Sequence, residues 1–252
     1  MPRRICWFSC GAASAVATKL TLAAHPDAVI AYCHVIEEHP DNGRFLRECE
    51  EWFGRRVQVL RADKYGGSIY EVFRQRRYLG GHRGAPCTLL LKKEVRRQFE
   101  RPDDVHIFGY TSEEQGRVDR FIDANPETLI ETPLLDQGLG KADCLSMVAR
   151  AGIELPAMYR LGYQNNNCVG CVKGGAGYWN KIRRDFPSRF ADMARTERLI
   201  GYALCRVRGQ RTFLDELPED AGNPVKDAPP SCSFNCELIE LESLAEARKR
   251  DE

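Results

Sequence analysis

Residues 7–20 read WFSCGAASAVATKL, and this stretch decides the predicted fold. The apolar run that ends at Phe8 is typical of a buried strand, and Ala15, Val16 and Leu20 fall on one face of a following helix. The turn between them consists of small residues: Ser9, Cys10, Gly11, Ala12, Ala13 and Ser14. Such a turn forms an anion site, because the first N–H groups of the helix lack partners and its dipole adds positive charge. The turn therefore predicts phosphate binding, although an ordinary strand–helix connection shares the pattern.

Composition and charge narrow the functional class. The chain has 252 residues, 43% of them hydrophobic, which suits one large domain or a core domain with an appendage. The formal net charge of +1 produces no global field that would draw the chain to nucleic acid or membrane. Neither a transmembrane run nor the apolar core of a signal peptide is present, so we expect a cytoplasmic protein without a membrane partner.

Strand-like and helix-like patterns alternate along the first part of the chain. The strand-like runs lie at 5–8, 28–35, 56–60, 105–108 and 129–131. This alternation predicts an α/β fold with a parallel sheet and helices on both faces. Ligands in such sheets bind at the carboxyl ends of the strands, where the loops at Ser9, Glu37, Gly109 and Pro133 begin.

The composition changes at Pro156, where Asn, Gly and aromatic residues become frequent. A polar, Pro-rich stretch follows from residue 209. We therefore predict a nucleotide-binding α/β domain at 1–155, a CxxC and helical region at 156–208 packed on the site, and an irregular, partly mobile tail at 209–252.

The cysteines form a second group of candidate site residues. Eleven of them, an odd number without a secretory signal, favour metal binding or thiol chemistry over a disulfide framework. Cys168 and Cys171 form a CxxC in a Gly/Asn turn, a spacing that lets two thiolates bind one metal or cluster. Cys87 sits at a loop–helix junction, which favours a thiolate, and Cys232 and Cys236 form a CxxxC.

Two ligand sets complete a site around the CxxC. Cys87 would give a three-cysteine iron–sulfur site with an open iron or a fourth ligand, whereas Cys232 and Cys236 would give a tetrahedral zinc site. Thiolates suit both metals, so donor softness does not separate the two sets. A redox CxxC, two merely buried thiols and a free nucleophile at Cys87 are the simpler interpretations.

Two polar motifs follow predicted strands. EEHPDNGRF offers Glu38 and His39, which suit Mg²⁺ or ribose hydroxyls but are also common on solvated loops. GYTSEEQGR offers Glu114 and Arg117 at the start of a helix, where the dipole alone favours acidic residues. Arg117 suits phosphate or sulfate, or a local ion pair.

Together these motifs resemble the phosphoadenosine-phosphosulfate (PAPS) reductase-like family of the adenine-nucleotide alpha-hydrolase (PP-loop) superfamily. More narrowly, they are similar to its small phage and prophage members. The resemblance rests on SCGAAS (9–14), EEHPDN (37–42), GAPCTLLLKK (84–93), GYTSEEQGR (109–117) and NNNCVGCVKGG (165–175).

The resemblance implies a five-stranded parallel, Rossmann-like sheet that binds an adenine nucleotide, either ATP or PAPS, with Mg²⁺ as a companion ion. The implied nucleotide-binding residues are Ser9, Cys10, Gly11, Ala12, Ser14, Glu38, His39, Gly109 and Tyr110. A [4Fe-4S] cluster, with zinc as the alternative, is implied at Cys87, Cys168, Cys171, Cys232 and Cys236. The implied catalytic residues are Cys87, Glu114 and Arg117.

The loop and the tail depart from the family patterns. The PP-loop pattern is SGG, then any residue, then Asp, and then Ser or Thr. In this chain Cys10 replaces the first glycine of that pattern, and Ala13 replaces the Asp. The loop is therefore closer to the SFGA-like loop of sulfonucleotide reductases, which bind PAPS without cleaving ATP. The tail lacks their catalytic ECGLH motif, so Cys232 or Cys236 would have to replace it.

Three functions agree with these patterns. The first is a nucleotide-dependent enzyme that reduces a sulfonucleotide or transfers sulfur, with a dithiol or sulfur-donor protein as partner. The second is a PP-loop ATP pyrophosphatase that thiolates or otherwise modifies a nucleobase, with basic clusters near Cys87 and Cys171 facing RNA or DNA. The third is a non-catalytic nucleotide- or nucleic-acid-binding protein with a structural zinc.

Overall fold

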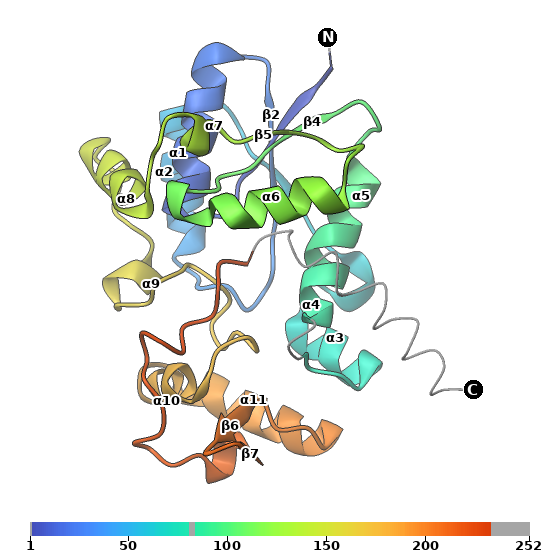
Figure 1. Cartoon of the computed structure of the whole chain (residues 1–252), viewed down its shortest axis with the longest axis vertical. Coiled ribbons are helices and arrows are strands. Elements are labelled where there is room, and N and C mark those ends of the chain that lie inside the picture. The colour runs from blue at the N-terminus through green and yellow to red at the C-terminus, as the bar shows by residue number, and fades with distance from the viewer. Residues whose placement is uncertain (1, 81–83, 233–252) are drawn as a thin grey trace. The chain divides into compact units, whose positions relative to one another are not determined.

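The computed structural model describes residues 2–80 and 84–232 (Figure 1), so the prediction for Cys236 lies outside the described residues. Contacts divide the chain into two compact units. The first comprises Met1–His34, Pro40–Arg61 and Val95–Arg160, and the second Val35–His39, Ala62–Glu94 and Leu161–Glu252. The second unit thus includes two segments from within the stretch that we assigned to the α/β domain.

The first unit contains the parallel sheet. Its strand order is β3-β2-β1-β4-β5, and every neighbouring pair is parallel. The strands are β1 (Arg4–Trp7), β2 (Val29–Cys33), β3 (Gln58–Leu60), β4 (Val105–Ile107) and β5 (Leu129–Glu131). The predicted five-stranded parallel sheet is therefore confirmed.

Helices cover both faces of this sheet. The helices of this unit are α1 (Ala12–Ala24), α2 (Asn42–Phe53), α5 (Glu94–Phe99), α6 (Gln115–Ala124), α7 (Pro133–Asp136), α8 (Lys141–Arg150) and α9 (Ala157–Arg160), with a 3-10 turn η3 (Ser112–Glu114). Of these, α9 lies away from the sheet (Figure 1). Successive side chains of a strand point to opposite faces. Cys6 accordingly joins a buried cluster with Val16 of α1, whereas the next residue, Trp7, packs against His106 and against Phe99 of α5.

The second unit is built from helices and a hairpin. Its elements are α3 (Ile69–Arg76), α4 (Pro86–Thr88), α10 (Ala176–Asp185), α11 (Pro187–Ile200), β6 (Cys205–Val207), β7 (Gln210–Thr212), the 3-10 turns η1 (Asp63–Tyr65) and η4 (Leu214–Glu216), and a π-helical turn η2 (Leu89–Lys93). Phe73, Trp179, Ile182 and Met193 are fully buried in it. The π turn interrupts the helix predicted after Cys87, and such turns are frequent at functional sites.

None of the helices in the described part of the chain is both long enough and apolar enough to cross a membrane.

Candidate functional site

The predicted phosphate loop follows β1, the strand at which the sheet order reverses. β1 lies between β2 and β4, and in open α/β sheets the crevice at such a reversal binds ligands. Helix α1 begins at Ala12, and Gly11, at its N-cap, offers no side-chain cap. The first turn of α1 contains no acidic residue. The first turn of α1 thus has the local features that suit an anion, and phosphate binding there stays a prediction.

Ser14 holds the loop in its shape. Its Oγ accepts a hydrogen bond from Ser9 N at 3.0 Å, lies 3.0 Å from Ser9 Oγ, and donates to Gly11 O at 2.9 Å. Cys10 adopts a left-handed φ of 55°, which costs a residue with a side chain about 1–3 kcal/mol and recurs at ligand sites. Ser14 is thus an internal part of the loop, whereas Ser9 is exposed to solvent.

Gly109 brings the end of β4 directly against α1. A Cβ atom at this position would lie 2.8 Å from both Cα and N of Ser14, so only glycine fits. The loops after β1 and β4 therefore meet at the sheet reversal. The neighbouring Tyr110 is buried, and the Arg117 guanidinium lies 5.7 Å from the centre of its ring.

The two predicted catalytic residues of the first unit, Glu114 and Arg117, form an ion pair with each other. Glu114 also accepts a hydrogen bond from Thr111 N at 3.3 Å, which caps the turn η3. Its neighbour Glu113 accepts from Lys141 N at 3.1 Å, at the start of α8. These carboxylates have structural partners, and the catalytic roles of Glu114 and Arg117 stay predictions.

Two residues beside the loop were not predicted from the sequence. The Tyr159 hydroxyl lies 3.3 Å from the point that a Cβ at Gly11 would occupy, and Lys141 Nζ lies 5.9 Å from the centre of the Tyr159 ring. Burial lowers the pKa of Lys141, and the charge of Glu113 opposes this effect. Lys141 begins α8 and is separated from β5 by α7, and no local pattern marks either Lys141 or Tyr159.

Glu38 and His39, which the resemblance assigns to nucleotide binding, belong to the second unit. Glu38 is buried and accepts a hydrogen bond from Lys92 Nζ at 3.1 Å. The His39 ring meets the edge of the Phe186 ring with 5.9 Å between their centres. The role in nucleotide binding stays a prediction for both residues.

The predicted metal ligands within the described residues gather in this second unit. Charge interactions link Cys232 with Cys87, Cys168 and Cys171. Cys168 is buried and the other three are half-buried. We call these four residues the thiol cluster. It combines members of the two ligand sets that the sequence left as alternatives.

The CxxC turn is held by a tyrosine that the sequence did not single out. The Tyr178 hydroxyl accepts hydrogen bonds from Gly170 N at 3.2 Å and from Cys171 N at 2.9 Å. Gly170 adopts a left-handed φ of 83°, and a Cβ there would lie 3.1 Å from the Trp179 ring. The turn thus needs glycine between its cysteines for both conformation and space.

Two lysines shape the electrostatics of the thiol cluster. Burial raises the pKa of Cys171 to about 11 and raises those of Cys87 and Cys168 well above their ordinary value. The thiolate expected at Cys87 from its loop–helix junction is therefore opposed by burial. Burial acts in the same direction on Cys232, but the charges of Lys92 and Lys173 outweigh it and lower its pKa. Burial would lower the pKa of Lys92, yet Cys232 and Glu38 hold it well above its ordinary value. The two lysines thus shift Cys232 toward the thiolate, the form that binds metals and attacks electrophiles.

The thiol cluster can be compared with the ligand arrangement that a single metal ion requires. Within residues 2–80 and 84–232, no three His, Cys, Asp or Glu side chains lie close enough to share one metal ion. A zinc ion requires all its sulfur ligands at about 2.3 Å from one point. No such single-ion site is therefore formed in the described residues, and the choice between a cluster and zinc stays a prediction.

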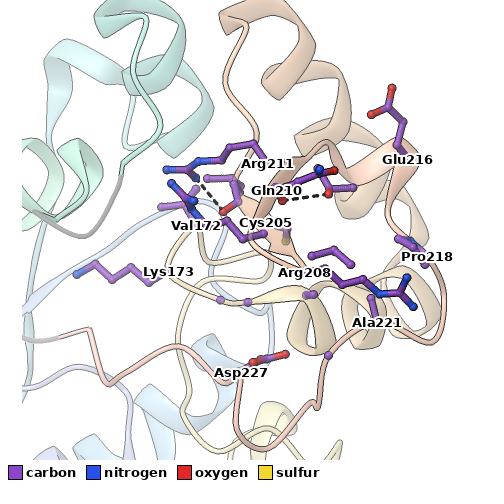
Figure 2. Close-up of a pocket in the computed structure, with 18 of the residues that line it drawn as sticks. Val172, Lys173, Cys205, Arg208, Gln210, Arg211, Glu216, Pro218, Ala221 and Asp227 are labelled. Atoms are coloured by element: carbon purple, nitrogen blue, oxygen red, sulfur yellow. Dashed lines mark hydrogen bonds between the residues drawn. The ribbon is translucent and has the colours of Figure 1, made fainter.

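A cavity of about 1400 Å³ lies in the second unit (Figure 2). Val172 and Lys173, which directly follow Cys171, line part of it, and the β6–β7 hairpin contributes Arg208 and Arg211. Lys173 thus lines the cavity, and its charge partly opposes the rise that burial causes in the pKa of Cys171. The lining also contains the carboxylates of Glu216, Asp220 and Asp227, so charges of both signs surround the cavity.

Comparisons with known proteins assign the chain to no family. No family model matches the chain, and no curated protein matches it. The chain is similar to the solved structure of phosphoadenylyl-sulfate (PAPS) reductase from Candida auris in a phosphate complex. The two are 12% identical, the match covers 65% of this chain and 80% of that chain, and the TM-score is 0.45.

Proposed function

We propose that the chain is an adenine-nucleotide-binding enzyme of sulfur chemistry, which reduces a sulfonucleotide or transfers sulfur with the help of a cysteine-ligated iron–sulfur cluster. The observation that carries the proposal is the presence, in one chain, of an uncapped phosphate-type loop after β1 and of four thiols that all interact with the half-buried cation Lys92. Either feature alone is common, and their combination in one chain supports nucleotide-linked sulfur chemistry.

The first unit would supply the nucleotide site. The N–H groups that begin at Ala12 and the exposed hydroxyl of Ser9 would donate to phosphate oxygens, and Lys141 would offset their charge. The first turn of α1 carries no carboxylate that would hold a metal ion on a departing pyrophosphate. This loop is therefore better suited to holding a nucleotide than to cleaving it.

The second unit would supply the sulfur chemistry. Cys87, Cys168, Cys171 and Cys232 would hold the cluster, which, when bound, supplies a redox-active metal–sulfide centre. Lys92 and Lys173 would stabilise the negative charge of a sulfonate or of a thiolate beside it. The lowered pKa of Cys232 agrees with such a role for the two lysines.

Anaerobic purification followed by assays with PAPS and a dithiol tests the proposal. In the reduction, the dithiol delivers two electrons, the bond between sulfur and the nucleotide oxygen breaks, and sulfite, the nucleotide and a disulfide are released. We expect a brown protein with about four iron and four sulfide per chain, and sulfite production that depends on PAPS. A colourless protein with stoichiometric zinc would contradict the cluster, and a loaded protein that binds no adenine nucleotide would contradict the nucleotide site.

The cavity favours a second candidate function, the ATP-dependent modification of a nucleobase in RNA or DNA. Its volume of about 1400 Å³ exceeds the roughly 300–1,000 Å³ of small-molecule sites. Lys173, Arg208 and Arg211 line it, together with three carboxylates. Part of a polynucleotide would fit such a space. Pyrophosphate release from ATP and Mg²⁺ that requires added RNA or DNA would support this function in place of PAPS reduction.

A further inference from the structure

Asparagine side chains just before the CxxC hold the segment that carries Cys232. Asn165 Nδ2 donates to Pro229 O at 2.9 Å, and Asn167 Nδ2 donates to Pro230 O at 2.9 Å. The run NNN at 165–167 is thus more than a polar loop. Its amides bind the backbone of a segment more than sixty residues further along the chain.

Asn167 contacts this segment on both sides of Ser231. Its Nδ2 bonds to Pro230 O, and its Oδ1 accepts from Cys232 N at 3.1 Å. A primary amide carries a donor and an acceptor side by side, as a neighbouring strand would. Pro229 and Pro230 have no N–H and cannot form a regular backbone ladder, so side-chain amides replace it.

Cys232 is also held through its thiol. Its Sγ lies 3.9 Å from Thr88 Oγ1, and Thr88 directly follows Cys87. Through its backbone, the same cysteine is bound to Asn167, which directly precedes Cys168. Cys232 is therefore fixed between the neighbours of two other thiols.

We propose that Asn167 is a positioning residue that places Cys232 in the thiol cluster. The inference rests on the proposed function, because it concerns the fourth thiol of the proposed cluster site. Asn167 is 7% exposed, so its hydrogen bonds are shielded from water, and a lost partner would leave buried polar groups unpaired. Without the amide, the segment at 229–232 loses the bond that sets the distance of Cys232 from the CxxC.

The test compares Asn167→Ala, Asn167→Asp and Asn165→Ala with the wild type. Asn165→Ala is the matched control, because it removes an amide that holds Pro229, three residues before Cys232. Asn167→Asp keeps an acceptor for Cys232 N but loses the donor to Pro230 O. Circular dichroism shows which variants fold, and Asn167→Asp keeps the test decisive should the alanine variant not fold.

The first readout is the alkylation rate of each cysteine in the metal-free protein, followed by mass spectrometry. We expect Asn167→Ala to raise the alkylation rate of Cys232 about tenfold or more relative to that of Cys168. Asn167→Asp should raise the alkylation rate of Cys232 less, and Asn165→Ala should raise it least. An unchanged rate at Cys232 in folded Asn167→Ala or Asn167→Asp would overturn the inference, whether or not the wild type binds a cluster.

The second readout is the iron content after anaerobic reconstitution. We expect Asn167→Ala to lose iron to the extent that Cys232→Ser does, while Asn165→Ala retains most of it. Full iron content in Asn167→Ala, alongside a loss in Cys232→Ser, would overturn the positioning role. If the wild type binds no iron, the proposed cluster is contradicted. If Asn167→Ala still makes Cys232 more reactive in that case, the positioning role is supported.

Discussion

A Cβ atom at Gly109 would lie 2.8 Å from the Cα atom of Ser14. Carbon atoms in favourable contact lie about 3.5–4.0 Å apart, so any side chain at Gly109 must push the end of β4 away from α1. We expect Gly109→Ala to lower the free energy of unfolding by about 1–3 kcal/mol and to weaken adenine-nucleotide binding at least about tenfold. Chemical denaturation and nucleotide titration measure the two effects.

Gly116 in α6 supplies the control for this variant. A Cβ there would meet only the flexible end of Arg120, at 3.8 Å, among its nearest atoms. Alanine is favoured over glycine inside a helix by about 0.5–1 kcal/mol, so Gly116→Ala should be neutral or stabilising. Wild-type nucleotide affinity in Gly109→Ala would show that no nucleotide uses the crevice between β1 and β4.

Ser14 and Ser9 should respond differently to the loss of their hydroxyls. Ser14→Ala removes the contacts to Ser9 and Gly11, so we expect a loss of about 1–2 kcal/mol in stability together with weaker nucleotide binding. Ser9→Ala should weaken binding with little change in stability, because Ser9 is exposed. Ser146→Ala, on the exposed face of α8, is the control. Unchanged affinity in both loop variants would mark the loop as a plain connection.

Cysteine substitutions should separate the thiol cluster from the remaining cysteines. We expect Cys232→Ser to lose most of the bound iron, because the thiolate favoured by Lys92 and Lys173 is removed. Cys144→Ala, in α8 of the first unit, should keep the wild-type iron content. Iron and sulfide analysis after anaerobic reconstitution measures both. Equal iron in the two variants would remove Cys232 from the ligand set.

Glu197 should make the stability of the fold depend on pH. It is fully buried, and its carboxylate accepts hydrogen bonds from Leu204 N at 2.5 Å and Leu214 N at 2.6 Å, on either side of the β6–β7 hairpin. Burial raises its pKa from 4.5 to about 7, although the two N–H groups oppose the shift. The folded protein therefore binds a proton that the unfolded chain releases in this interval.

The contribution of Glu197 to the free energy of unfolding is complete below pH 4.5 and is lost as the pH rises through about 7. The stability of the wild type relative to Glu197→Gln should accordingly fall over this range, by at most about 3 kcal/mol. Urea denaturation of both proteins at several pH values measures the difference. A difference that does not change with pH would show that Glu197 does not titrate here.

Several features could be predicted because they depend on neighbours in the sequence. The apolar run before Phe8 and the small residues after it predicted β1, the loop and α1 correctly, since strand and helix periodicity is local. The glycine at 109 could be placed at a strand end in the same way. The interruption of the helix after Cys87 was not predicted, because a π turn has no simple sequence pattern.

The sequence by itself thus determined the α/β class, the position of the loop after β1 and the identity of the thiols. Only the tertiary structure decided that Cys232 joins Cys87, Cys168 and Cys171, and that Asn167 holds it across 65 positions of the chain. It alone placed Glu38 against Lys92, 54 positions away. The physical reason is that helix and strand formation depends on side chains a few residues apart, whereas these contacts exist only after burial has brought distant segments together.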